Sequence, residues 1–137
     1  MRFVDTNILL YRISTDSSEV TKQAIASEIL SARDLVLSAQ VLQEFYVQAT
    51  RLTRPDALPH DAAAKLIRSW KRYPVEPIDI DLVEAALAST VRWQLSYWDA
   101  VILEAARRSG CEQLLSEDLS HGQNYDGVQV INPFKAA

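Results

Sequence analysis

Four acidic residues stand beside short apolar segments that are far apart in the sequence: Asp5, Glu44, Asp99 and Asp118. Carboxylates a few ångströms apart repel one another, so some of them stay protonated unless a counter-charge is present. A hard divalent cation supplies that charge, and an oxygen-only ligand set suits Mg²⁺ or Mn²⁺ and not zinc. Beside a phosphodiester, such ions position and activate water and stabilise the leaving oxygen. If the four acids meet in the fold, they can therefore support phosphodiester hydrolysis.

These acids can meet only if the segments that carry them fold into one layered structure. Short β-type segments alternate with longer helical patterns, and the chain contains no repeat or low-complexity tract. Strands are expected at 2–4, 35–38, 75–78, 113–116 and 128–131. Alternating strands and helices require crossover connections, which predicts a mainly parallel sheet of about five strands with helices on both faces. The expected fold class is a three-layer α/β/α structure.

Helix signals lie between the expected strands. Helices are expected from Thr6, from 17 or 18 to about 33, after Ser38, from about 61 to 72, from Asp81, and from 97 to 109. Ser96 stands at the cap position of the last helix, and Gly110 ends it. Asp81 and Glu84 form a variant of the capping box at the start of the preceding helix.

The placement of the acids relative to these elements favours a shared site. In an open parallel sheet, ligands bind outside the carboxyl ends of the strands. Asp5 directly follows the first expected strand, and Asp118 comes two residues after the fourth. Glu44 lies in the second turn of the helix after the second strand, and Asp99 in the first turn of the last helix. We therefore expect all four acids at one end of the sheet.

Each acid also has an interpretation that requires no chemistry. Asp5 could cap the helix that follows it, and Asp99, three residues after Ser96, could complete a capping box. Glu44 could be a solvated helix residue, and Asp118 a turn residue. It is the joint placement of the four acids that favours a metal site.

The composition indicates one domain in a reducing compartment. The chain has 137 residues, which is a usual length for a single domain. Cys111 is the only cysteine, which excludes an intrachain disulfide. Asp5 interrupts the only apolar stretch that a signal peptide could use, and no run approaches the roughly 18 apolar residues of a membrane span. We therefore expect a cytoplasmic protein without membrane association.

The charge balance gives no general attraction for nucleic acid, because the net charge is −4, from 18 acids and 14 bases. If four acids share one metal site, phosphate would be attracted by bound cations and by local basic patches. Candidate RNA contacts are Lys65, Arg68 and Arg72 at helical spacing, together with Trp70, Trp93 and Trp98. A solvated helix face explains the basic residues more simply, and large aromatic side chains serve cores and interfaces more often than bases.

Four segments around the acids resemble the motifs of the PIN-domain family. Val-Asp-Thr-Asn-Ile-Leu-Leu at 4–10 is similar to the opening motif, and Gln-Glu-Phe at 43–45 to the second. Tyr-Trp-Asp-Ala-Val-Ile at 97–102 resembles the third motif, and Leu-Leu-Ser-Glu-Asp-Leu-Ser-His-Gly-Gln at 114–123 the fourth. Together with Ile-Asn-Pro-Phe at 131–134, the fourth motif resembles one branch of the VapC toxins. The resemblance covers the whole chain, with the motifs in the family's order.

The resemblance implies a single PIN domain over 1–137, with a Rossmann-like fold and Mg²⁺- or Mn²⁺-dependent endoribonuclease activity. By position, Asp5, Glu44, Asp99 and Asp118 take the four acidic catalytic roles. The resemblance makes Asp5 and Asp99 the direct metal ligands. Glu44 and Asp118 would complete the site through water molecules.

The resemblance also implies supporting residues and partners. Thr6, Asn7, Ser116 and Glu117 would orient the carboxylates through hydrogen bonds. The expected partners are an RNA substrate, a second copy of the chain in a homodimer, and a VapB-type antitoxin that wraps the toxin and blocks its acidic site. Transfer, ribosomal and messenger RNA are all compatible substrates.

Two other functions fit parts of the pattern. A phosphatase of the doubly wound type needs a second aspartate two residues after the first, but position 7 is Asn7. A catalytically silent PIN scaffold that binds RNA or protein would be favoured by the loss of an acid, and none of the four is lost. A nucleotide-binding module is disfavoured because the chain has neither a glycine-rich fingerprint nor a P-loop.

Overall fold

Six short strands form one sheet in the order β3-β2-β1-β4-β6-β5. They are β1 (Arg2–Val4), β2 (Leu35–Ser38), β3 (Val75–Glu76), β4 (Gln113–Leu115), β5 (Asn124–Tyr125) and β6 (Val128–Ile131). All neighbouring strands are parallel except β5 and β6, which are antiparallel. The computed structural model describes residues 1–135. The predicted α/β class with a mainly parallel sheet is confirmed.

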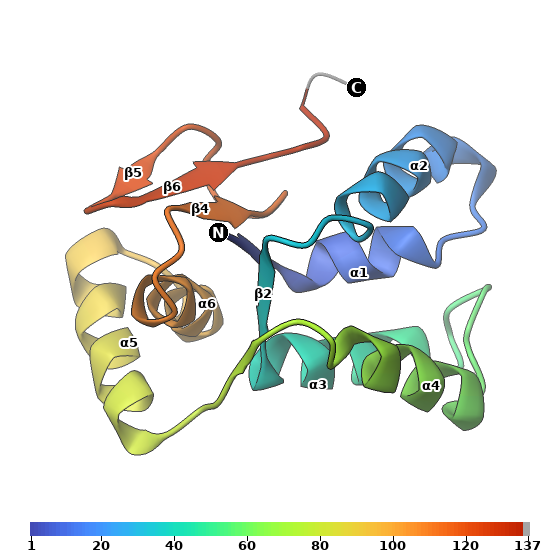
Figure 1. Ribbon diagram of the computed structural model, residues 1–137, viewed down its shortest axis with the longest axis horizontal. Helices are drawn as coiled ribbons and strands as arrows, with labels where there is room; N and C mark the ends of the chain where they lie inside the picture. The colour runs from blue at the N-terminus through green and yellow to red at the C-terminus, as the bar shows by residue number, and fades with distance from the viewer. Residues whose placement is uncertain (136–137) are drawn as a thin grey trace.

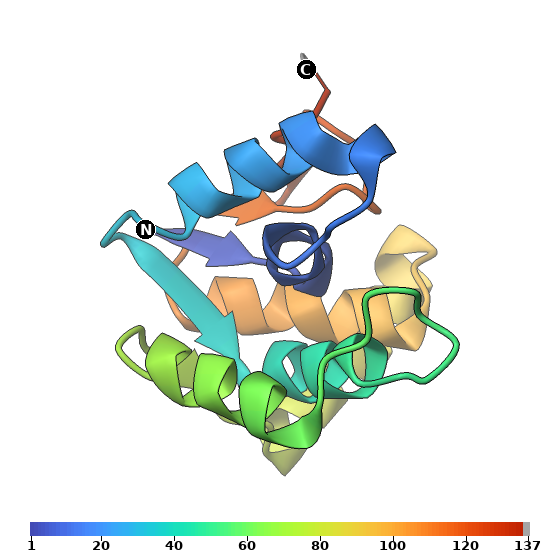
Figure 2. The same cartoon turned by 90° about the vertical axis from the view of Figure 1, so that its right-hand side faces the viewer.

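Helices cover both faces of this sheet. They are α1 (Thr6–Arg12), the 3-10 turn η1 (Ser17–Glu19), α2 (Val20–Ile29), α3 (Ala39–Ala49), α4 (His60–Trp70), α5 (Ile80–Trp93) and α6 (Tyr97–Arg108). Helices α5 and α6 lie on one side of the strands, and α1 and α2 on the other (Figure 1). Figure 2 shows the same layers after a quarter turn, with α2 above β1 and α6 below it. No helix within residues 1–135 is long and apolar enough to cross a membrane.

The central strands are apolar because they are covered on both faces, as parallel strands are in layered α/β folds. Phe3 and Val4 of β1 and Leu35 and Leu37 of β2 have no exposed surface. Helix α6 packs across β2, β4 and β6, while α1 and α2 pack against each other on the opposite side. This burial fixes where each strand ends, and with it the positions of the residues that follow.

Two helices near the carboxyl ends of the strands begin at serine caps. The hydroxyl of Ser38 accepts a hydrogen bond from the N–H of Val41 at 3.3 Å, at the start of α3. The hydroxyl of Ser96 accepts one from the N–H of Asp99 at 3.2 Å, at the start of α6. The predicted beginnings of these two helices are confirmed, and they carry Glu44 and Asp99.

The predicted start of α5 at Asp81 is wrong. The helix begins at Ile80, and its cap is Asp79, whose carboxylate accepts a hydrogen bond from the N–H of Leu82 at 3.0 Å. Asp79 also pairs with the guanidinium of Arg108 at the end of α6. This ion pair between distant segments favours Asp79 over Asp81 as the cap, and the sequence pattern of one helix does not reveal it.

The long helix expected from 17 or 18 to 33 is shorter in the structure. Its first residues form η1, and α2 ends at Ile29. The carbonyl of Leu30 accepts hydrogen bonds from the Tyr73 hydroxyl at 2.5 Å and from Arg72 at 2.9 Å. The Tyr73 hydroxyl also bonds the carbonyl of Ala32 at 2.9 Å. These contacts anchor the chain after α2 to the segment before β3, so the helix stops.

The sheet contains one strand more than expected. Strand β5 pairs with β6 through a tight turn at Asp126 and Gly127, whose φ angles are +55° and +103°. An Asp-Gly pair is the usual signature of such a hairpin turn, because both positions need positive φ. Strand β3 is shorter than the expected 75–78 because Pro77 has no N–H to extend the ladder.

Candidate active site

Asp5 stands at the carboxyl end of β1 and is almost completely buried, with 3% of its surface exposed. One carboxylate oxygen accepts the N–H of Thr6 at 2.6 Å, so the residue caps α1. The other accepts the hydroxyl of Ser116 at 2.6 Å, from the segment after β4. Asp5 is therefore a helix cap, as its simpler interpretation held, and it is also held between the ends of two neighbouring strands.

The surroundings of Asp5 oppose its ionisation. Burial raises the pKa of its carboxyl to about 7, and the charges of Asp118 and Glu44 act in the same direction. The hydrogen bonds from Ser116 and Thr6 lower the pKa but do not cancel the effect of burial. A carboxyl with this pKa, surrounded by other acids, is a group that a bound cation would stabilise in its charged form.

Glu44 reaches the same region from α3. One of its carboxylate oxygens accepts the Thr6 hydroxyl at 2.7 Å, and the other accepts the side-chain amide of Gln40 at 2.8 Å. The same Gln40 amide nitrogen donates to the backbone carbonyl of Trp98 at 3.2 Å. Glu44 is thus fixed by α1 on one side and by its own helix on the other, and Gln40 connects it to the start of α6.

Asn7 joins Asp5 to Asp118. Its side-chain nitrogen donates to a carboxylate oxygen of Asp118 at 3.2 Å and approaches one of Asp5 at 3.5 Å. Its side-chain oxygen accepts the N–H of Glu117 at 3.4 Å. The N–H of Asp118 in turn donates to the hydroxyl of Ser116 at 3.1 Å. The segment after β4 is therefore bound to the first turn of α1 through the side chains predicted to orient the acids.

Asp99 completes the group from the first turn of α6, where its side chain is partly buried. Burial raises the pKa of its carboxyl, and the charges of Asp118 and Glu44 raise it further. The same two acids thus act on both Asp5 and Asp99. The structure brings all four sequence-predicted acids to the carboxyl end of the sheet.

The donor set fits a hard cation that keeps several water molecules. The side chains that converge on Asp5 present oxygen atoms and amide groups, and no histidine or cysteine is among them. Within residues 1–135, no three aspartate, glutamate, histidine or cysteine side chains are grouped closely enough to hold one ion together. Direct coordination by one or two carboxylates, with water as the remaining ligands, is the arrangement that Mg²⁺ prefers. Asp5 and Asp99 could supply those two carboxylates.

Glu117 differs from the expectation that it orients the acids through its side chain. Its carboxylate accepts hydrogen bonds from Lys22 at 2.6 Å and from the hydroxyl of Tyr11 at 2.5 Å. Burial acts to raise the pKa of Glu117, but these two partners lower it overall. Only the backbone N–H of Glu117 reaches the site, through Asn7. The side chain anchors the loop that carries Asp118 to α1 and α2.

Sequence reasoning missed three residues of this arrangement: Gln40, Tyr11 and Lys22. Gln40 precedes Glu44 by four positions and Tyr11 follows Asn7 by four, so each lies on the same helix face as a motif residue. This spacing could have revealed both of them. No local signal marks Lys22, because its partner Glu117 is 95 positions away in the sequence.

The basic residues expected on α4 do not form a continuous free stripe. Arg72 follows the helix and donates to the carbonyls of Leu30 and Ser69. Lys65 and Arg68 are exposed on α4. Lys65 and Arg68 therefore belong to a solvated helix face, whereas Arg72 has a structural role that its spacing did not predict.

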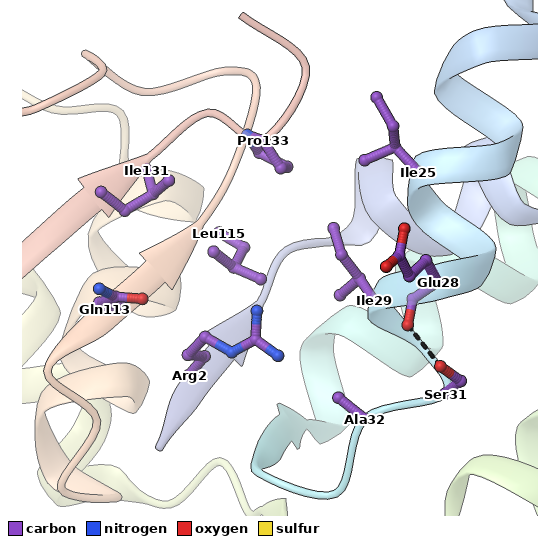
Figure 3. Close-up of a pocket in the computed structure, with 10 residues that line it drawn as sticks. All are labelled: Arg2, Ile25, Glu28, Ile29, Ser31, Ala32, Gln113, Leu115, Ile131 and Pro133. Atoms are coloured by element: carbon purple, nitrogen blue, oxygen red, sulfur yellow. Dashed lines mark hydrogen bonds between the residues drawn. The ribbon is translucent and has the colours of Figure 1, made fainter. Parts of the chain in front are cut away.

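A separate hollow of about 460 Å³ lies between α2 and the face of the sheet formed by β1, β4 and β6 (Figure 3). It is lined by Arg2 and Gln113 at the beginnings of β1 and β4, and by apolar side chains such as Ile25 and Ile29. None of the four acids lines it, and the Arg2 guanidinium is already paired with Asp34 at 2.9 Å. The acidic site, and not this hollow, carries groups suited to catalysis.

Solved structures with the same fold extend over nearly the whole chain. The VapC20 toxin of Mycobacterium tuberculosis, which cleaves the sarcin–ricin loop, has 23% identity, 86% and 92% coverage of the two chains, and a TM-score of 0.68. A toxin–antitoxin complex from Klebsiella pneumoniae has 20% identity, 98% coverage of each of the two chains, and a TM-score of 0.73. The DNA-bound VapBC2 complex of Rickettsia felis has 14% identity, covers 94% of this chain and 96% of its own, and has a TM-score of 0.63. At these identities the likeness shows a shared fold.

The sequence itself identifies the family. No curated protein is a significant match to the chain. The family model of the PIN domain, however, matches residues 2–124. That range contains the four acids and the residues that bind them, and the α/β fold agrees with the match. The chain belongs to the PIN domain family.

Proposed function

We propose that this protein is a Mg²⁺- or Mn²⁺-dependent endoribonuclease that acts as the toxin of a VapBC-type toxin–antitoxin module. The observation that carries the proposal is the buried carboxyl of Asp5, whose pKa is raised to about 7. It lies at the ends of β1 and β4, within the influence of Glu44 and Asp118. Its role as the cap of α1 does not require this acidic surrounding, and a bound cation would offset the cost of ionising a buried carboxyl beside other acids.

The chain's own residues would divide the work of hydrolysis. Asp5 and Asp99 would bind the ion directly. Glu44 and Asp118 would complete the site by holding water molecules around the ion. When bound, the ion supplies positive charge at the scissile phosphate and makes water a stronger nucleophile. In the reaction, the water oxygen forms a bond to phosphorus and releases a proton to solvent, one phosphorus–oxygen bond of the RNA backbone breaks, and the departing oxygen takes up a proton from solvent.

Thr6, Asn7 and Ser116 would keep the carboxylates in place before the substrate arrives. Each donates a hydrogen bond to an acid of the site, at 2.7 Å, 3.2 Å and 2.6 Å respectively. Fixed donors of this kind restrict the rotamers of metal-binding carboxylates and are a common requirement of metal sites. They also lower the entropy that must be lost when the ion binds.

The toxin role and the partner are supported by the solved structures of the same fold. One is named as a toxin that cleaves the sarcin–ricin loop, and others are toxin–antitoxin complexes. For this chain we infer a VapB-type antitoxin that covers the acidic site, and an RNA substrate. A homodimer is part of the same proposal, supported by the exposed apolar residues Ile80, Leu87 and Val91 along α5. Sedimentation of the purified chain alone tests it.

The test of the activity is cleavage of total cellular RNA by the purified protein, with Mg²⁺, with Mn²⁺ and with EDTA. Asp99→Asn keeps the size of the side chain but removes an anionic ligand, and we expect metal-dependent cleavage to fall by orders of magnitude. The matched control is Asp81→Asn, an exposed acid in the first turn of α5, which should cleave as the original protein does. Discrete fragments that require metal and disappear only in Asp99→Asn would support the proposal.

The alternative function is a silent PIN scaffold that binds RNA or protein without cutting. It predicts no cleavage in any metal, with metal binding intact and antitoxin shown to be absent. Equal cleavage by the original protein and by Asp99→Asn would instead reveal a contaminating nuclease. The presence of all four acids favours the catalytic function over the silent scaffold, which the loss of an acid would have favoured.

A further inference from the structure

An open groove of about 530 Å³ adjoins the acidic site between α3 and the start of α6. It is lined by Gln40, Gln43, Glu44, Val47, Gln48 and Trp98. Glu44 belongs both to this groove and to the acid group, and Trp98 directly precedes Asp99. A nucleotide whose phosphate lies at the acids can therefore place its base in the groove without leaving the protein surface.

Trp98 has the properties of a stacking platform. Its side chain is 63% exposed, whereas Trp70 is 3% exposed and packs edge-on against Phe45 in the core. The ring of Tyr97 contacts the ring of Trp98 edge-on, with centroids 5.2 Å apart, which restricts the indole without covering both of its faces. An indole held in this way and open to solvent is suited to stacking on a planar base.

The remaining lining residues match the edge of a base and not a phosphate. Gln43 and Gln48 are exposed and carry amides that both donate and accept hydrogen bonds. Val47 is 54% exposed and adds an apolar surface, and the only charged lining residue is the acid Glu44. A negatively charged phosphate would be repelled here, while an uncharged aromatic ring with polar edges fits the whole set.

Gln40 makes the groove rigid. It is 3% exposed, and its amide nitrogen bonds both Glu44 and the carbonyl of Trp98. The two helices that form the groove are thereby linked at its floor, and Trp98 and the acids keep a fixed relative position. A fixed distance between a base-binding surface and a catalytic group is what determines which phosphodiester is cut.

We propose that this groove is a nucleobase subsite, in which the base of the nucleotide next to the scissile phosphate stacks on Trp98 and is selected by the amides of Gln43 and Gln48. The inference rests on the proposed ribonuclease function, which it deepens by naming the residues that choose the cleavage position. An antitoxin segment is the competing occupant, and the test separates the two.

The test measures RNA binding and cleavage in separate experiments. Binding of fluorescently labelled five-nucleotide RNAs made of uridine, cytidine or adenosine is followed by anisotropy in EDTA, where metal-dependent cleavage is absent. Trp98→Ala should weaken binding by about tenfold or more, because stacking on one aromatic ring supplies a large part of the affinity of single-stranded RNA. Trp98→Phe should restore most of it, and Val20→Ala, an exposed apolar control at the start of α2, should leave it unchanged.

Cleavage in Mn²⁺ gives the second readout. Trp98→Ala should raise KM more than it lowers kcat, and Gln43→Leu or Gln48→Leu should change the relative rates on RNAs that differ in the base beside the cut. Unchanged RNA affinity, KM and cleavage positions in Trp98→Ala would overturn the proposed subsite. The proposed ribonuclease function would still stand in that case if Asp99→Asn loses metal-dependent cleavage. Weaker inhibition by antitoxin with unchanged RNA binding would also overturn it, and would assign the groove to the protein partner.

Discussion

The hydroxyl of Ser116 donates a 2.6 Å hydrogen bond to the buried carboxylate of Asp5, across 111 positions of sequence. The two residues follow β4 and β1, which are adjacent parallel strands, so their side chains meet as soon as the sheet forms. Through this contact the carboxylate at the end of β1 is linked to the loop that carries Asp118. The stability of the sheet and the geometry of the acids are therefore coupled.

The pH dependence of stability should report the burial of Asp5. Its pKa is about 7 in the folded protein and 3.8 in the unfolded chain, so the folded state binds the proton more tightly. Without metal, its contribution to stability is complete below about pH 4 and is lost as the pH rises through 7, by up to about 4 kcal/mol. Asp5→Asn should remove most of this slope. Urea unfolding in EDTA between pH 5 and 8 measures it.

The matched control for that experiment is Asp81→Asn, whose side chain is exposed on α5. It should keep the slope of the original protein across the same pH range. A slope that persists in Asp5→Asn would show that another group titrates between pH 5 and 8, and that the burial of Asp5 is relieved in solution.

Divalent metal should stabilise the folded protein, because the ion binds only when the acids are assembled. At a metal concentration 100 times the dissociation constant, the gain is about 2.7 kcal/mol, which raises the Tm by roughly 5–10 °C. Thermal unfolding with Mn²⁺ and with EDTA measures the shift. Both Asp5→Asn and Asp99→Asn should lose most of it, whereas an equal shift in these two variants would place the ion elsewhere.

Ser116→Ala should reduce both stability and cleavage. The hydroxyl is fully buried, donates to Asp5 and accepts the N–H of Asp118, so its loss removes the short hydrogen bond to the buried carboxylate and the partner of that N–H. We expect a cost of about 1–3 kcal/mol in the free energy of unfolding. Cleavage should also need a higher pH, since this hydrogen bond lowers the pKa of Asp5. Ser69→Ala, on the exposed face of α4, is the control for both measurements.

Lys22→Ala should affect cleavage more than stability. Lys22 and Glu117 form a 2.6 Å ion pair whose side chains are 37% and 25% exposed, and partly exposed pairs contribute about 0–1 kcal/mol. The pair nevertheless anchors the loop before Asp118, so cleavage in Mn²⁺ should fall several-fold. Tyr11→Phe should show a weaker effect of the same kind. A drop in unfolding free energy large enough to explain the lost activity would contradict this positioning role.

Some features of the fold depended on local patterns and were accessible from the sequence. The apolar runs of β1 and β2, the serine caps of α3 and α6, and the glycine that ends α6 are each specified within a few residues. The alternation of strands and helices along the chain then predicted that Asp5, Glu44, Asp99 and Asp118 lie at one end of a parallel sheet. The family motifs lie in the same segments, which is why the class of fold and the PIN family followed from the sequence.

Other features were decided by contacts between distant segments. The end of α2 depends on Tyr73, the start of α5 on Arg108, and the side chain of Glu117 on Lys22. Residues that lie tens of positions apart leave no periodic signal, so their pairing appears only when the layers are packed. The same holds for the raised pKa of Asp5, which follows from burial between two strand ends. The sequence by itself determined which acids were available; the tertiary structure decided how deeply each is buried and what holds it, because burial and hydrogen bonding depend on neighbours in space.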